Sequence, residues 1–600
     1  MSTPLLRIED LSVGFAGRTV VREVSLQLAA GECLALVGES GSGKSVTARA
    51  VIGLAGTGAQ VRAAALDFDG IDLRALRSAQ WRRLRGRRIG YVLQDALTSL
   101  DPLRRIGHEI AEPLEIHRLV GPGELDDAVL GLLAATGIPD PHERLLQYPH
   151  ELSGGLRQRA LIASAVAAGP DLLIADEPTT ALDATVQQQI LRLLRERQAA
   201  GNAVLLISHD LTVVADSADT VAVMYAGLVV EQGSKATIFD NPAHPYTVEL
   251  LASAPSLDAP ARPAATARWS APAATGCPFG GRCPVADTRC REELPPPAAL
   301  GDGRMVRCWR PGAHTGGPRT VTLSAPAHKV NEKLEPALEF DAVTLHFALP
   351  SGGRRLAVDE VSLRVDRGDF VGLVGESGSG KSTLARLALA HLTPESGTVR
   401  FDGLPWSTLS EKQRRPARHR VQLIDQDPLS AFDPRYTVAQ IIGEALARTH
   451  TRSARARRVA ELLAEVGLDP MLEGRYPAQL SGGQRQRVAI ARALAAEPEL
   501  IVADEPVSAL DVTIQAQILD LFARVQRETG AAMLFISHDL AVVRWLCRRV
   551  AVLHRGRIVE SGSTEEVFAR PAHPYTRSLL APRRAGQVRS DLPPSHAVAG

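Results

Sequence analysis

A length of 600 residues exceeds what one hydrophobic core normally organises, so we expect two to four domains. Apolar residues make up 45% of the chain and charged residues 22%, which indicates a globular protein. The 68 basic and 67 acidic residues nearly cancel, which excludes an overall field that would favour nucleic acid or an anionic membrane.

The start of the chain, MSTPLLRIEDLSVGF, lacks a basic segment followed by an apolar run, so we expect no signal peptide. No later window offers about 18 uninterrupted apolar residues, so we expect no transmembrane helix either. The chain is therefore expected in the cytosol, where disulfides rarely persist.

The first motif that carries chemistry is GESGSGKS at 38–45, between the apolar run CLALVG and the helical spacing of SVTARAVIGL. Together with LLIAD and AVLLIS, the apolar run predicts a buried parallel sheet and hence an α/β unit. The glycines let backbone N–H groups surround phosphate oxygens, and the following helix directs its positive N-terminus at the same anion. Lys44 is expected to reach the β and γ phosphates and Ser45 to hold Mg²⁺. The predicted nucleotide-binding residues here are Gly38, Ser40, Gly41, Gly43, Lys44 and Ser45.

An acid pair, Asp176–Glu177, ends the apolar run LLIAD. Asp176 is expected to support Mg²⁺ through its water shell, and Glu177 to orient or deprotonate the attacking water. His209 follows the strand-like AVLLIS, and we expect it to sense the γ-phosphate and couple the nucleotide to the acid. We therefore predict Glu177 and His209 as catalytic residues.

Four of the six cysteines gather in a Pro/Ala-rich stretch that lacks a sustained helical or strand period. A short segment with hardly any core needs a crosslink, and four metal-bound thiolates can supply one. Zinc and [4Fe–4S] both accept four cysteines, although the close C-x₂₋₄-C pairs of structural zinc sites are missing; a metal-free set is the third alternative. Cys33 and Cys547 lie in apolar contexts typical of small core residues. The candidate metal ligands are Cys277, Cys283, Cys290 and Cys308.

The second half of the chain retraces the first. GESGSGKS returns at 375–382, LSGGLRQR at 152 returns as LSGGQRQR at 480, LLIADEPTTALD at 172 as LIVADEPVSALD at 500, and NPAHPYT at 241 as RPAHPYT at 570. The predicted roles repeat as well, with Glu505 and His538 as catalytic residues and Ser382 as a Mg²⁺ ligand. The predicted nucleotide-binding residues of this half are Gly375, Ser377, Gly378, Gly380, Lys381, Ser382, Thr383 and Asp504.

In each half, the order of P-loop, glutamine loop, LSGG signature, acid pair, ALD loop and histidine resembles the ABC-type ATPase. The resemblance implies two tandem P-loop ATPase domains of α/β fold with a small cysteine-rich irregular module between them. It also implies ATP as the ligand, with Gln94 and Gln426 among the ligands of Mg²⁺. We place the first ATPase domain at 1–245, its extension with the four cysteines at 246–320, a linker at 321–336, the second domain at 337–570 and a short tail at 571–600.

In this family ATP is held between the P-loop of one unit and the signature of the other, so the resemblance implies two composite sites within one chain. The LSGG motif opens a helix, whose N–H groups can reach the γ-phosphate. The facing residues would be Lys44 with Ser481 and Gly483, and Lys381 with Ser153 and Gly155.

Two further positions bear on these sites. Phe15 and Phe347 match the place where this family stacks adenine, and either fits a core position equally well. Leu156 stands where the second unit has Gln484. Because Leu156 belongs to the signature paired with Lys381, we expect that site to be the slower one.

The HPYT motif near the end of each unit, with LTSLDP and LSAFDP after the glutamine loops, resembles the ATPases of bacterial di- and oligopeptide importers. The resemblance implies two integral-membrane permease subunits that contact residues 97–101 and 429–433, an extracytoplasmic substrate-binding protein, and a location at the cytoplasmic face of the cell membrane. A four-cysteine extension at this position resembles an iron–sulfur module, which favours [4Fe–4S] over Zn²⁺. Nickel and glutathione importers share these motifs and stay open as alternatives.

A soluble twin-ATPase that acts on ribosomes or nucleic acid is the rival class. The Arg-rich stretch RSAQWRRLRGRRIG at 77–90 is compatible with it, but aromatic residues interleave too rarely for base stacking. Proteins of that class usually join their units by long charged helices, whereas this linker is rich in proline. We therefore expect no nucleic acid among the partners.

Overall fold

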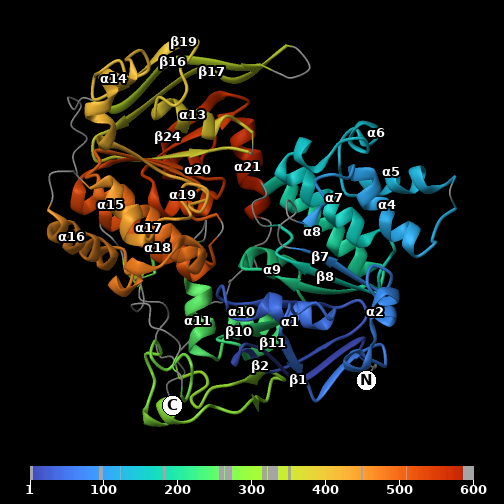
Figure 1. Cartoon of the computed structure of the whole chain (residues 1–600). Helices are drawn as coiled ribbons and strands as arrows, with labels where there is room; N and C mark the ends of the chain where they lie inside the picture. The colour runs from blue at the N-terminus through green and yellow to red at the C-terminus, as the bar shows by residue number, and fades with distance from the viewer. Residues whose placement is uncertain are drawn as a thin grey trace, which may run out of the picture.

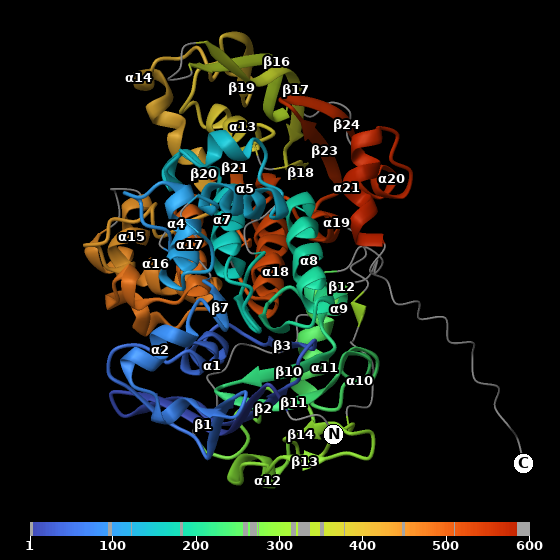
Figure 2. The same cartoon turned by 90° about the vertical axis from the view of Figure 1, so that its right-hand side faces the viewer.

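In the computed structural model, the two halves of the chain lie against each other (Figures 1 and 2). None of the described helices combines the length and the apolar composition needed to cross a bilayer. The structure describes residues 4–93, 99–121, 123–179, 184–255, 262–263, 273, 275–313, 320–321, 336–348, 353–376, 378–446, 451–508 and 510–584.

The first unit is built on a mainly parallel sheet whose central strands are buried along their whole length. Strands covered on both faces read as continuous apolar runs rather than as alternating ones, which is why CLALVG, LLIAD and AVLLIS predicted them. The α/β prediction is thus confirmed for this unit. In spatial order the strands are β7 (Ile89–Val92), β8 (Leu172–Asp176), β9 (Ala203–Ile207), β3 (Cys33–Val37), β10 (Thr220–Tyr225) and β11 (Leu228–Ser234), the last antiparallel to β10.

A second, antiparallel sheet completes the unit, with β1 at its centre. Its strands are β1 (Leu6–Phe15), β2 (Arg18–Leu28), β4 (Ala59–Arg62), β5 (Ala65–Phe68) and β6 (Ile71–Asp72). The described helices of the unit are α1 (Lys44–Val51), α2 (Ser78–Leu84), α4 (Ile106–Ile116), α5 (Leu125–Ala135), α6 (Pro141–Arg144), α7 (Gly154–Val166), α8 (Ala184–Ala199), α9 (Leu211–Ser217), α10 (Lys235–Asp240) and α11 (Pro245–Ala252).

The second unit repeats this architecture. Its main sheet runs β20 (Val421–Ile424), β21 (Leu500–Asp504), β22 (Ala532–Ile536), β18 (Phe370–Val374), β23 (Arg549–His554) and β24 (Arg557–Ser563), and its antiparallel sheet contains β16 (Pro336–Ala348), β17 (Arg354–Asp366) and β19 (Ser396–Phe401). The helices are α13 (Lys381–Ala388), α14 (Glu411–Arg414), α15 (Val438–Ala445), α16 (Arg452–Glu465), α17 (Gly482–Ala495), α18 (Val512–Thr529), α19 (Leu540–Leu546), α20 (Thr564–Ala569) and α21 (Pro574–Arg584).

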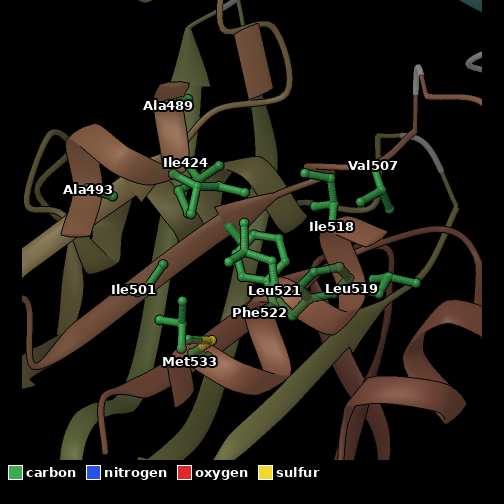
Figure 3. Packing of buried hydrophobic residues seen from close by; sticks show 14 of the residues in the cluster. Ile424, Ala489, Ala493, Ile501, Val507, Ile518, Leu519, Leu521, Phe522 and Met533 are labelled. Atoms are coloured by element: carbon green, nitrogen blue, oxygen red, sulfur yellow. The ribbon is translucent and has the colours of Figure 1, made fainter. Parts of the chain in front are cut away.

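Helices pack on the main sheet to form the core. Figure 3 shows Ile501 and Met533 of neighbouring strands facing Phe522 of α18. The ring of Phe522 meets that of Phe535 edge to face at 5.8 Å. Truncation of such a buried ring costs about 3–5 kcal/mol, so this packing contributes substantially to the stability of the unit.

The cysteine-bearing extension adds to the first unit's main sheet. Strand β14 (Met305–Val306) pairs antiparallel with β11, and β13 (Ala298–Ala299) pairs with β14 (Figure 2). We expected an irregular module here; two-residue strands have no period that a sequence can show, and an existing sheet edge decides their pairing. The other described elements are β12 (Arg262–Pro263), α12 (Thr288–Glu292) and β15 (Thr320–Val321).

Candidate functional site

The first P-loop joins the end of β3 to the start of α1. Its glycines take left-handed conformations, with φ of 144° at Gly38 and 102° at Gly43, and a Cβ at Gly38 would collide with the carbonyl of Met224. Lys44 is buried, and its Nζ donates to the carbonyls of Gly38 at 2.7 Å and Glu39 at 3.0 Å. The ammonium therefore lies inside the turn. Burial lowers the pKa of Lys44, and nearby carboxylates counteract that effect.

Ser45 and Asp176 lie side by side below this loop. Ser45 Oγ donates to Asp176 Oδ1 at 2.9 Å, and the hydroxyl of Tyr91 donates to Asp176 Oδ2 at 2.9 Å. Burial raises the pKa of Asp176, while these two hydrogen bonds oppose the shift. A serine hydroxyl beside a carboxylate is the oxygen donor set that Mg²⁺ prefers in P-loop ATPases.

Glu177 and His209 form the next pair. Glu177 adopts φ 51°, and its Oε1 lies 3.3 Å from His209 Nδ1. Burial alone would lower the pKa of His209, but the hydrogen bond with Glu177 raises it above its ordinary value. The positive φ at this glutamate is a strained conformation of the kind that gathers at functional sites.

The second unit has the same geometry. Lys381 Nζ donates to the carbonyls of Gly375 and Glu376, both at 2.8 Å. His538 Nδ1 lies 3.2 Å from Glu505 Oε2, and Gln426 Nε2 donates to the same oxygen at 3.3 Å.

Burial and hydrogen bonds shift the pKa values of the two acids of this site, Asp504 and Glu505. Burial alone would raise the pKa of Glu505, but the hydrogen bond from His538 lowers it. Burial raises the pKa of Asp504, and a hydrogen bond with Ser382 opposes this shift. Gly378, Gly380 and Thr383 lie in the loop and the first turn of α13. Gln94 and Ser377 lie outside the described residues.

The second unit reaches the first P-loop directly. Asp511 caps α18 through its Oδ1, which accepts from the N–H of Ile514 at 3.0 Å, and its Oδ2 accepts from the N–H of Ser40 at 3.1 Å. A cavity between the halves is lined by both His209 and His538. The chain therefore brings elements of both units to the first site, although our sequence analysis gave Asp511 no role beyond its place in the ALD loop.

Each signature serine caps its own helix. Ser153 Oγ accepts from the N–H of Leu156 at 3.4 Å, and Ser481 Oγ accepts from the N–H of Gln484 at 3.3 Å. Only the second signature adds the reciprocal bond, in which Gln484 Oε1 accepts from the N–H of Ser481 at 3.0 Å. The leucine of the first signature has no side-chain acceptor for that bond. The opposition of these signatures to the lysines stays a prediction.

Gly155 and Gly483 occupy the first turns of α7 and α17. A Cβ at Gly483 would approach Ile514 Cγ2 to 2.7 Å, so a larger residue there would have to displace the Ile514 side chain. Phe15 packs partly buried against the core of the first unit, whereas Phe347 is 40% exposed. Stacking of either ring on adenine stays a prediction.

The four cysteines of the extension are neighbours in space. The N–H of Cys277 donates to the carbonyl of Cys290 at 2.7 Å, and the N–H of Arg310 donates to Cys308 Sγ at 3.4 Å. Burial raises the pKa of Cys308 to about 11, with charge repulsion from the other three thiols adding to it. All six cysteines are free thiols. Among the described residues, no three Cys, His, Asp or Glu side chains stand as close together as metal ligands do.

Tyrosines supply contacts that our sequence analysis missed. Tyr246 Oη accepts from the N–H of Glu39 at 2.9 Å, and Tyr575 Oη accepts from the N–H of Glu376 at 3.0 Å. Both tyrosines belong to the repeated HPYT motif, so the repeat was the available signal. The role of the motif, which is to hold the backbone of the P-loop through the tyrosine hydroxyl, is visible only in the fold.

Comparisons with known proteins agree with this geometry. The ABC transporter family matches residues 21–180 and 358–508, and the C-terminal region of oligopeptide/dipeptide transporters matches 230–290 and 559–583.

Three similar proteins extend over nearly the whole chain. The oligopeptide transport ATP-binding protein OppD of Mycobacterium bovis is 43% identical, covering 96% of this chain and 98% of that protein. The uncharacterized ABC transporter ATP-binding protein YejF of Escherichia coli is 43% identical, with coverage of 97% and 100%. The glutathione import ATP-binding protein GsiA of Salmonella choleraesuis is 42% identical, with coverage of 97% and 89%. The chain therefore belongs to the ABC transporter family, as an ATP-binding protein of the oligopeptide/dipeptide transporter group with two ABC domains.

Proposed function

We propose that this chain is the ATP-hydrolysing subunit of a membrane importer of di- and oligopeptides. The observation that carries the proposal is the presence of two complete sets of P-loop lysine, Ser–Asp pair and Glu–His pair in one chain that also matches the oligopeptide/dipeptide transporter region. One relative is named for oligopeptide transport and another for glutathione import. Glutathione is itself a tripeptide, so it is the second candidate cargo.

At the first site, Lys44 exchanges its carbonyl partners for the β and γ phosphates of ATP. The hydroxyl of Ser45 and the side chain of Gln94 would hold Mg²⁺, and the carboxylate of Asp176 would support the ion through its water shell. Mg²⁺ supplies neutralisation of phosphate charge when it is bound. Lys381, Ser382, Asp504 and Gln426 do the same at the second site.

Glu177 orients the attacking water and accepts its proton, and His209 holds that carboxylate in place. The pair 3.3 Å apart fits this role, because the histidine fixes one carboxylate oxygen and leaves the other for water. Glu505 and His538 act in the same way in the second unit. Closure of each signature over the opposite P-loop, with Ser481 over Lys44 and Ser153 over Lys381, completes the two sites.

The partners are two integral-membrane permeases and, through them, an extracytoplasmic binding protein that selects the peptide. In this proposal the chain associates with the permeases from the cytoplasmic side of the membrane. Residues 97–101 and 429–433 receive the permeases; 97 and 98 lie outside the described residues, and Leu429 is partly exposed at 39%. Nucleic acid has no part in this function.

The four-cysteine site holds a [4Fe–4S] cluster in this proposal, with Zn²⁺ as the alternative. The support is the donor chemistry alone, because one short segment supplies four free thiols, the number of ligands that such a cluster takes. Cys277, Cys283, Cys290 and Cys308 would be the ligands. The bound group would crosslink a segment that has little core of its own.

Reconstitution tests the transport function. The chain is co-purified with its permeases, and the complex is reconstituted into proteoliposomes. Uptake of a labelled tripeptide and of labelled glutathione is then measured in the presence of the binding protein and ATP. ATP-dependent uptake that is lost in the Glu177→Gln/Glu505→Gln double variant supports the proposal. Co-purification with ribosomes instead of permeases, or uptake of neither substrate, overturns it.

Metal analysis tests the cysteine site. Anaerobically purified protein is expected to be brown and to lose its iron when Cys283 or Cys290 becomes serine. Stoichiometric zinc in a colourless preparation moves the assignment to zinc. Folded protein without either metal contradicts both assignments.

A further inference from the structure

A side chain of the cysteine-bearing extension enters the first P-loop. Arg282 follows a tight turn of the extension, and its side chain is only 3% exposed. Its Nη1 donates to Glu39 Oε1 at 2.8 Å, and its Nη2 donates to Glu249 Oε1 on α11. The extension lies against α11 and the end of the first unit's sheet in Figure 1. A residue about 240 positions from the P-loop in sequence therefore touches it in space.

The aromatic ring of Phe279 anchors the turn that carries this arginine. Phe279 is 1% exposed and meets the rings of Tyr225 and Tyr246 edge-on, each at 5.5 Å. The N–H groups of Arg282 and Cys283 both donate to its carbonyl at 2.9 Å. Since the ring is locked in the core, the guanidinium has little freedom to move away from its two carboxylates.

The carboxylate of Glu39 is also held from the second unit. Thr513 Oγ1 lies 3.0 Å from Glu39 Oε1 and 2.7 Å from Asp511 Oδ1, so its one hydroxyl hydrogen is shared between the two carboxylates. Asp511 in turn accepts from the N–H of Ser40, the next residue of the P-loop. Glu39 is therefore the point where the extension, the first P-loop and the loop of the second unit meet.

The negative charge of Glu39 bears directly on phosphate binding. A carboxylate inside a phosphate-binding turn repels the anion that the turn is built to hold. Arg282 offsets this charge and keeps the carboxylate directed toward the extension. Removal of only one partner of a buried ion pair leaves the other charge uncompensated, which is costly.

We propose that Arg282 is a positioning residue for ATP binding at the first site: it holds the Glu39 carboxylate away from the phosphates and links the cysteine-bearing extension to the contact between the two units. The link couples the folded state of the extension to the first P-loop. The inference rests on the proposed function of Lys44 in the first ATP site.

The equivalent P-loop of the second unit receives a different set of contacts. Glu376 has the same backbone contact to a tyrosine hydroxyl, through Tyr575 at 3.0 Å, as Glu39 has through Tyr246. The described part of the chain ends at residue 584, and no described extension covers this loop. Arg282 therefore acts on one of the two sites.

The test uses the full chain in a Lys381→Ala background, so that binding of a fluorescent ATP analogue reports the first site. Arg282→Gln is expected to weaken binding roughly tenfold, as for mutations along a coupled network. Adding Glu39→Gln should restore affinity to within about threefold, because the repelling charge is then gone. Urea unfolding of the same variants separates this from a merely structural role, which predicts that stability falls and recovers while the analogue affinity of the folded chain stays unchanged.

Two matched controls separate this effect from damage to the fold. Arg304→Gln removes a second buried arginine of the extension, which pairs with Asp302 and Glu231, and Arg289→Gln removes an exposed one, which pairs with Glu293. Both are expected to leave analogue affinity unchanged. Lys44→Ala in the same background must abolish binding; if it does not, the proposed ATP site is wrong. Normal affinity in Arg282→Gln, or failure of Glu39→Gln to restore it, overturns the role of Arg282.

Discussion

The two P-loops have the same eight residues, GESGSGKS, yet different surroundings. In the first unit, the extension covers the HPYT motif and leaves His244 and Tyr246 buried; in the second, His573 and Tyr575 of the same motif are partly exposed. The backbone contacts of the two loops agree closely, and at the first loop Arg282 of the extension also binds the loop glutamate. Identical local sequence therefore specifies the geometry of the turn, while the segments packed on it set its electrostatics.

The largest expected effect on activity comes from the glutamate that both units share, Glu177 in the first and Glu505 in the second. Glu177→Gln or Glu505→Gln is expected to slow ATP hydrolysis by about 10²–10⁴-fold while ATP still binds and holds the units together, because the amide cannot accept the proton of water. Steady-state turnover and ATP-dependent compaction measure this. Full turnover in both single variants would show that the assigned bases are wrong.

Truncation of Phe279 tests the extension, which packs on the first unit. Phe279→Ala should destabilise the first unit by about 3–5 kcal/mol, because a fully buried ring is lost from a tight aromatic cluster. Chemical unfolding followed by limited proteolysis of the extension measures the loss. Leu103→Ala, at a side chain that is 84% exposed, is the control and should change stability by no more than about 0.5 kcal/mol. Equal protease resistance of Phe279→Ala and the native chain would contradict this anchoring role.

The two signatures differ in one helix cap, which sharpens the comparison of the sites. Because Leu156 cannot make the reciprocal bond of Gln484, the site of Lys381 is expected to be the slower, so Lys44→Ala should reduce turnover more than Lys381→Ala. The two losses of turnover should differ roughly two- to fivefold, which corresponds to the free energy of about one weak helix cap. Leu156→Gln should reduce this difference between the two lysine variants. Equal losses in the two lysine variants would remove the asymmetry.

The smallest expected effect concerns pH. The pKa of His209 is raised by its bond to Glu177, so this pair contributes stability fully below the unfolded pKa near 6.5 and loses it as pH rises through the folded value. His209→Gln should therefore cost about 1 kcal/mol or less at pH 6 and almost nothing at pH 9. Urea unfolding at the two pH values checks this. A larger cost at pH 9 than at pH 6 would reverse the assigned sign.

The extension illustrates what sequence reasoning could not reach. The clustering of its cysteines in the sequence predicted a shared metal site, but among the described residues no three possible ligands lie close enough together to hold an ion. The strands β13 and β14 were not predicted, because two residues carry no periodicity. Arg282 was indistinguishable from the other arginines of an Arg-rich chain, since its role depends on the burial of Phe279 beside it.

The sequence by itself determined the repeated α/β units, the two P-loops, the acid pairs and the histidines. Continuous apolar runs and fixed motif spacings are local properties, and the strands, turns and helix starts that they specify depend on nearby residues. Only the tertiary structure decided that Asp511 and Thr513 reach the first P-loop and that Arg282 meets Glu39 there. Those contacts join residues separated by hundreds of positions, and packing of the extension and the second unit onto the first brings them within hydrogen-bonding distance.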